Sequence, residues 1–75
     1  MKKNPYFLIY ASDLAKYVVA YARERNCDIT NLKLQKILYY IEGYFLAEYG
    51  YSLYPALIEG WQFGPVLPSV YYEYS

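Results

Sequence analysis

Residues 29–49 form a capped run that is apolar on almost every side, and this run limits what the chain can fold into. The sequence ITNLKLQKILYYIEGYFLAEY begins with a good helix cap, Thr30 or Asn31, and is followed by Gly50, which readily takes the left-handed conformation that closes helices. A helix of about five turns is therefore predicted. Because apolar side chains surround it, we expect this helix to be central and enclosed by other elements.

Two features of this helix are unfavourable for a helix: a glycine in its middle and lysines in its first turns. Gly43 lies in the middle, where glycine costs up to about 1 kcal/mol relative to alanine. We expect another helix or the Trp61 ring to approach it closely, so that Gly43→Ala destabilises the fold. Lys33 and Lys36 lie in the first turns, near the positive end of the helix dipole, and are interpreted as a solvated face.

An amphipathic helix is predicted before this one. Ser12 is its expected N-cap, Asp13 suits its first turn, and Asn26 is the expected stop signal. The apolar residues between them follow helical spacing, and include Leu14, Val18, Tyr21 and Ala22.

After the central helix the chain changes to a loop, and then to a short strand or irregular connector over residues 57–63. Gly64-Pro65 marks a turn, and Pro68 suits the first position of a short helix that reaches Tyr74. The expected fold class is mainly α: a small helical domain with two long helices, a short extended connector, and a short third helix after the Gly-Pro turn. This third helix must dock, because two turns are not stable alone.

The residue inventory excludes several kinds of site. The chain of 75 residues has one cysteine, Cys27, and no histidine, so it can form neither an internal disulfide nor a Cys/His zinc site. The commonest general base is missing too, which argues against an enzyme. Glu42, Glu48 and Glu59 imitate an acid/base or metal set, but they are spread over two elements and are interpreted as a solvated acidic face. No cofactor is expected.

Charge is divided unevenly along a chain whose net charge is zero. Residues 1–36 hold all seven basic side chains and a net charge of +4, whereas residues 37–75 hold only acids and carry −4. A nucleic-acid surface is one interpretation of such asymmetry. We favour the alternative that the basic first helix packs against the acidic second half.

Targeting signals are weak in this sequence. Residues 2–11 resemble a secretory signal only faintly, since their apolar stretch is short and ends at Ser12-Asp13. Acidic residues interrupt the apolar runs well before the roughly 18 residues that a membrane span needs. We therefore expect a cytoplasmic protein.

Two motifs in fixed order resemble a known family. The run TNLKLQKILYY at residues 30–40, followed by Gly43 and by WQFGPVLP at residues 61–68, resembles the Panacea domain, the SocA-like antitoxin and phage-associated domain of bacteria and prophages. The resemblance implies a mainly helical protein that binds and neutralises a toxin encoded beside it, without catalytic residues. Because the family's domains continue for several more helices, residues 1–75 are interpreted as a single domain corresponding to the N-terminal half, short or truncated relative to the family.

Thirteen tyrosines cannot all be buried in so small a core. We predict that Tyr39, Tyr40 and Tyr44 fill the core with their hydroxyl groups at its rim, and that an interface role is as favourable for the tyrosines after residue 50. The candidate partner-binding residues are the two lysines of the central helix together with aromatic residues of that helix and of the tail: Lys33, Lys36, Tyr40, Tyr44, Tyr51, Tyr54, Trp61, Phe63, Tyr71, Tyr72 and Tyr74.

Three functions stay open from the sequence. The first is an antitoxin-like module that neutralises a protein, either a toxin or, in a phage, a host defence enzyme. The second is a small nucleic-acid-associated regulator that uses Thr30-Asn31 with Lys33 and Lys36 in helix-turn-helix fashion. Direct nucleic-acid binding is disfavoured because no cation lies near the C-terminal tyrosines. An enzyme is the third and least favoured, and homo-oligomers are compatible with all three.

Overall fold

The computed structural model describes residues 9–55 and 57–75, so most of the signal-like segment at residues 2–11 lies outside the described residues. The described residues form three helices and a hairpin in the order α1 (Ala11–Glu24), α2 (Asn31–Tyr49), β1 (Glu59–Trp61), β2 (Gly64–Val66) and α3 (Pro68–Glu73). The predicted mainly α class, with two long helices and a short third, is confirmed. None of the described helices is long and apolar enough to cross a membrane.

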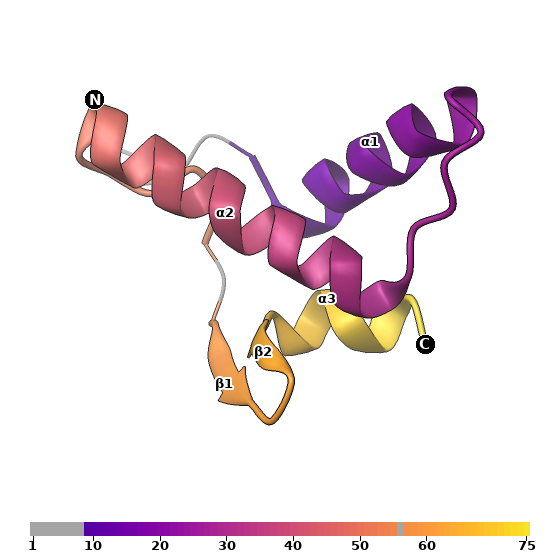
Figure 1. Cartoon of the computed structure of the whole chain (residues 1–75). Coiled ribbons are helices and arrows are strands. Elements are labelled where there is room, and N and C mark those ends of the chain that lie inside the picture. Colours follow the sequence, from indigo (N-terminus) through magenta and orange to yellow (C-terminus); the bar gives the residue numbers. More distant parts are fainter. Residues whose placement is uncertain (1–8, 56) are drawn as a thin grey trace.

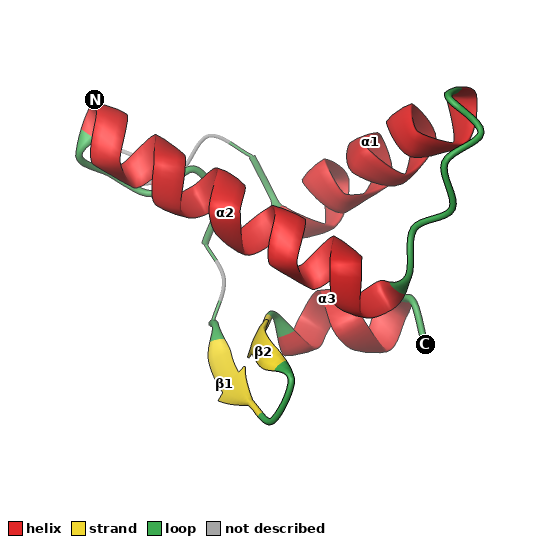
Figure 2. Ribbon diagram, viewed as in Figure 1, coloured by secondary structure: helices red, strands yellow, loops and turns green. Residues whose placement is uncertain are grey.

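The two long helices diverge in a V. The start of α1 lies near the middle of α2, and the linker after α1 crosses the open end of the V (Figure 1). Helix α3 lies beneath the N-terminal half of α2 and contacts both long helices. The hairpin projects beside α3, and the C-terminal half of α2 extends beyond α1 and α3 (Figure 2).

Of the two end signals predicted for α1, the N-cap is wrong and the stop signal is confirmed. Its N-cap is Tyr10, which makes no side-chain cap, and the prediction of Ser12 as N-cap is wrong because Ser12 already lies inside the helix. Asn26 does stop the helix: it has a φ of 54°, and its N–H donates to the carbonyl of Arg23 while the N–H of Cys27 donates to that of Ala22. These two bonds satisfy carbonyl groups that a helix end otherwise leaves unpaired.

Both predicted ends of α2 are confirmed. The Thr30 hydroxyl accepts a hydrogen bond from the N–H of Lys33 at 3.1 Å, as an N-cap does. Gly50 ends the helix in the left-handed region with a φ of 80°. The helix therefore has the length that its caps dictate.

The Gly-Pro pair lies in a strand and not in a turn. Trp61 pairs with Gly64 across the antiparallel hairpin, which makes Gln62 and Phe63 the turn residues. Gly64 has a φ of 123°, which only glycine adopts easily, so it allows the chain to reverse at the start of β2. Pro65 can occupy β2 because a two-stranded hairpin leaves positions where no N–H is needed.

The hydrophobic core covers only one side of α2. Among the described residues, the buried apolar side chains come from all three helices, the connector and β2: Ala11, Ala15, Leu34, Leu38, Tyr54, Val66, Leu67 and Val70. The expectation that α2 is enclosed is wrong, because α1 and α3 pack against its Leu34 and Leu38 side and no other described helix covers the opposite side.

One polar side chain is buried with this core. Gln35 has no exposed surface, and its Oε1 accepts a hydrogen bond from the N–H of Leu67 at 2.9 Å. Its Nε2 donates to Oδ1 of Asn31 at 3.0 Å, and Nδ2 of Asn31 donates to the carbonyl of Tyr71 at 2.9 Å. Two side chains of α2 thus hold both the start and the last turn of α3.

The expected attraction between the basic first helix and the acidic second half is not seen as ion pairs. Within residues 9–55 and 57–75 the one ion pair joins the neighbours Glu24 and Arg25, at 3.9 Å and exposed, where such pairs contribute little. Helix α1 instead reaches the C-terminal segment through Ser12, whose hydroxyl donates to the Glu73 carboxylate at 3.1 Å.

The close approach expected at Gly43 is also absent. Within the part of the chain that the structure describes, a Cβ at this position would meet no heavy atom of another element within 4 Å, neither a helix nor the Trp61 ring. The prediction that Gly43→Ala destabilises the fold is therefore reversed.

We expect Gly43→Ala to raise the free energy of unfolding by about 0.5–1 kcal/mol, because it removes the helix cost of glycine without a clash. Gly50→Ala is the matched control: this site is equally open but has a positive φ, so alanine should destabilise by about 1 kcal/mol. Urea unfolding of both variants measures the difference. Equal effects of the two substitutions would contradict the structure.

We expect Gln35→Met to destabilise the fold by about 1–3 kcal/mol, since it leaves the buried N–H of Leu67 without an acceptor while nearly preserving volume. Gln62→Met in the exposed hairpin turn controls for the change of residue type and should be nearly neutral. Chemical denaturation of the two variants tests this. A neutral Gln35→Met would show that the bond does not hold α3.

Candidate functional site

The structure distributes the candidate residues over two exposed faces and the core. Lys33, Lys36, Tyr40 and Tyr44 lie on the outer side of α2, away from Leu34 and Leu38. Trp61, Phe63, Tyr71 and Tyr72 belong to the hairpin and α3. The remaining three are Tyr51, Tyr54 and Tyr74.

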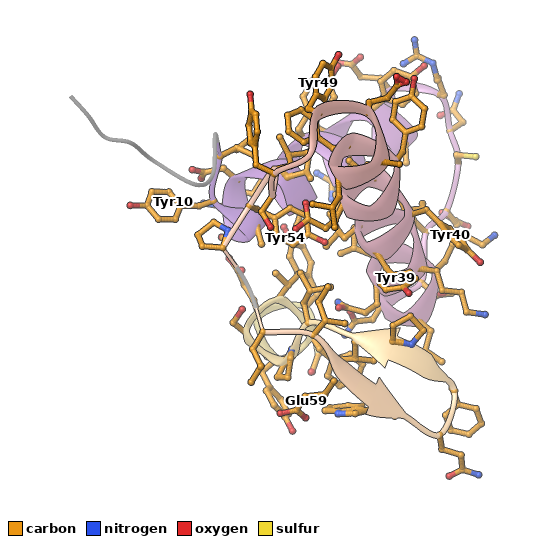
Figure 3. All side chains as sticks on the ribbon, turned by 90° about the vertical axis from the view of Figure 1, so that its left-hand side faces the viewer. Tyr10, Tyr39, Tyr40, Tyr49, Tyr54 and Glu59 are labelled. Atoms are coloured by element: carbon orange, nitrogen blue, oxygen red, sulfur yellow. The ribbon has the colours of Figure 1, made fainter. Side chains whose placement is uncertain are left out.

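Tyr54 is part of the core, so its side chain does not offer a contact to a partner. It is 1% exposed, and its hydroxyl donates to the carbonyl of Leu38 at 2.7 Å. In Figure 3 it lies inside, whereas Tyr39 and Tyr40 project from α2. Burial raises the pKa of the Tyr54 phenol above its usual value, and the nearby Glu42 carboxylate raises it further.

Glu42 is hydrogen-bonded to the connector that contains Tyr54. Its Oε2 accepts a hydrogen bond from the Ser52 hydroxyl at 2.8 Å, and its Oε1 accepts one from the N–H of Leu53 at 2.7 Å. The interpretation of Glu42 as part of a solvated acidic face is therefore wrong: the half-buried carboxylate fixes the loop that follows α2. Within the described residues no group of three acidic or cysteine side chains could hold a metal ion.

The outer face of α2 is defined here as Lys33, Lys36, Tyr40, Gly43 and Tyr44. All five are exposed, with Tyr40 at 69% and Tyr44 at 70%. The prediction that Tyr39, Tyr40 and Tyr44 fill the core is wrong, since Tyr39 is exposed as well and its ring lies 5.9 Å from that of Tyr40. The apolar rings of these three tyrosines led to the expectation of burial, but α1 and α3 cover only the other side of α2.

The second face is a cluster of rings that we call the hairpin–α3 cluster, formed by Trp61, Tyr71 and Tyr72, of which Trp61 and Tyr71 are half-buried and Tyr72 is exposed. The Trp61 ring lies 5.0 Å from that of Tyr71 and 6.1 Å from that of Tyr72, and the two tyrosine rings are 5.7 Å apart. The indole Nε1 of Trp61 donates to the Glu59 carboxylate at 2.9 Å. The Tyr72 side chain is 67% exposed, and Phe63 at the hairpin turn is 66% exposed.

The last two candidates pack within the chain. Tyr51 meets the Phe45 ring edge-on at 5.6 Å, beside the end of α2. Tyr74 is half-buried against the core, and partial burial together with Glu73 raises its pKa while Arg23 lowers it. Neither side chain belongs to the two exposed faces.

Two clefts between α1 and α2 were not anticipated from the sequence. One, of about 490 Å³, lies beside the linker and Tyr74, and half of its lining residues belong to the linker. The other, of about 360 Å³, is lined by Tyr17, Val18, Tyr21, Ala22, Arg25, Cys27, Ile29 and Ile37. The Arg25 guanidinium stacks over the Tyr21 ring at 3.6 Å. Helical spacing placed Val18 and Tyr21 on one stripe of α1 but gave no sign that the stripe would border an open cleft.

The fold and these surfaces define a small helical domain that is built around one thin core and presents aromatic side chains on two separate faces. Residues 34–75 match the family described as antitoxin SocA-like, Panacea domain. The chain belongs to this family, and the resemblance of its two motifs is confirmed.

A curated relative extends the comparison towards the N-terminus. Antitoxin SocA of Caulobacter vibrioides (strain NA1000 / CB15N) is 40% identical over 65 residues, which are 87% of this chain and 35% of the relative. The chain therefore spans about a third of the length of this relative. No solved structure matches the chain.

We expect Tyr54→Phe to lower the free energy of unfolding by about 1 kcal/mol near neutral pH, because the buried carbonyl of Leu38 loses its donor. The exposed Tyr44→Phe is the control and should be neutral. Urea unfolding of both variants gives the comparison.

The same variant tests the pH dependence. A phenol whose pKa is raised in the folded state contributes stability that is complete below its unfolded pKa of about 10 and is lost as pH rises above that value. The parent chain should therefore lose stability more steeply above pH 10 than Tyr54→Phe does. Parallel slopes would mean that Tyr54 is not held in its neutral form.

Proposed function

We propose that this chain is an antitoxin-type protein without catalytic activity that neutralises a protein toxin by binding it directly. Membership of the antitoxin SocA-like family carries the proposal, and 40% identity to an antitoxin over 65 residues supports it. The hairpin–α3 cluster lies entirely within the matched residues 34–75. We therefore assign the toxin contact to this cluster.

The cluster has the chemistry of a protein interface. Tryptophan and tyrosine are enriched where protein contacts contribute most binding energy, because each buries a large area with few rotatable bonds. The rings of Trp61, Tyr71 and Tyr72 support one another at 5.0–6.1 Å. Asn31 and Gln35 hold the underlying helix, so little side-chain freedom is left to lose on binding.

Charge indicates the kind of surface that fits this cluster. Glu59 and Glu73 are exposed around it, and residues 37–75 contain no lysine or arginine. An acidic rim around aromatic rings suits a toxin surface with apolar side chains and basic neighbours. The same distribution disfavours nucleic acid, whose phosphates would face carboxylates.

The test uses the protein encoded beside this chain, induced in a bacterial host as the candidate toxin. Co-expression of this chain should restore growth, and the two purified proteins should form a complex. Tyr72→Ala and Phe63→Ala should each weaken binding about tenfold or more, since both side chains are exposed and their loss should not unfold the chain.

The matched control is Tyr17→Ala, because Tyr17 is as exposed as Phe63 but lies on α1. It should leave both growth and binding unchanged. Growth restored without a complex would overturn direct neutralisation. A complex that is weakened by Tyr17→Ala and not by Tyr72→Ala would overturn the assignment to the hairpin–α3 cluster.

A further inference from the structure

The outer face of α2 has room for the close approach of another helix. Apart from its chain neighbours and the backbone of its own helix, no heavy atom of the described residues lies within 4 Å of the place where a Cβ of Gly43 would stand, and Tyr40, Tyr44 and Ala47 around it are exposed. The distance between packed helices is set by the side chains at their contact, so a glycine flanked by an alanine permits the shortest distance. Among residues 9–55 and 57–75, no other element packs against Gly43.

The charges of α2 oppose the dipole of the helix itself. Its first turn contains Lys33 and no acidic residue, and its last turn contains Glu48 and no basic residue. Helix α1 has the ordinary arrangement, with Asp13 in its first turn and Arg23 in its last. In α2 each end therefore has a charge that an antiparallel neighbour would stabilise better than the helix does.

A second α2 has the complementary pattern. Lys36 and Glu48 lie at equal distances from residue 42, beside Gly43, and are about 18 Å apart along the helix. A two-fold axis at this point pairs the helices antiparallel. It places Lys33 and Lys36 of one copy near Glu48 and the C-terminal carbonyls of the other, and Tyr40 of one copy against Tyr44 of the other.

We infer that a second copy of this chain docks on the outer face of α2, antiparallel and related by a two-fold axis that passes between Tyr40 and Tyr44, level with residue 42. Such a contact uses the same patch on both copies, as dimers with two-fold symmetry do. The C-terminal half of α2 extends past α1 and α3, so this half is accessible to a second molecule (Figure 1). The inference is independent of the proposed toxin contact, which uses the hairpin–α3 cluster.

Charge reversal in residues 1–75 tests the pairing. Lys33→Glu/Lys36→Glu gives like charges at both ends of the contact, and so does Glu48→Lys in a separate variant. Each should weaken self-association about tenfold in sedimentation velocity. An equimolar mixture of the two variants should recover association, because opposite charges then meet at both ends. Both changes remove charges that oppose the helix dipole, so the variants should fold at least as well as the parent.

Two further variants separate this face from the rest of the surface. Ala47→Gln, at an exposed position of the outer face, should weaken association by holding the helices apart while keeping α2 stable, and Ala20→Gln, at an exposed position of α1, should not. Lys16→Glu, also exposed on α1, controls for charge reversal alone. A parent chain that stays monomeric at every concentration would overturn the inference. So would variants that weaken association without recovery on mixing.

Discussion

The rest of the structure depends on the carboxamide of Gln35. Helix α3 has six residues, too few to be stable alone, and its first buried N–H comes from Leu67 just before it. Gln35 accepts that N–H inside the core and orients Asn31, which accepts from Gln35 and donates to α3 at Tyr71. Because the bond from Leu67 to Gln35 is buried and the two bonds of Asn31 are partly buried, they fix the direction of α3 and with it the rings of Tyr71 and Tyr72.

Local signals in the sequence were sufficient for most of the secondary structure. Thr30 and Gly50 mark the ends of α2, Asn26 stops α1, and Pro68 begins α3, because each of these residues acts on the backbone beside it. Ser12 failed as a cap since the preceding residue was equally able to enter the helix. Such errors are confined to a residue or two.

Burial was less predictable, because it depends on which elements reach a given face. Tyr40 and Tyr44 are apolar enough for a core but lie on the side of α2 that α1 and α3 leave uncovered, whereas Tyr54 comes from a loop and is fully enclosed. Glu42 had no sequence signal to distinguish it from Glu48, and only the path of the connector brings Ser52 and Leu53 to its carboxylate. The two clefts likewise arise from the angle between α1 and α2, which no residue encodes alone.

The hydrogen bonds of the Glu42 carboxylate also indicate the order in which parts of the chain fold. Its bonds to Ser52 and Leu53 span 10 and 11 residues, and the bond of Tyr54 to Leu38 spans 16, so α2 and its connector close through short loops. The contact of α1 with Glu73 spans 61 residues and must follow much larger loop closure. The amide protons of α2 and residues 50–54 should then be protected before those of α1 in pulsed hydrogen exchange, and simultaneous protection would refute this order.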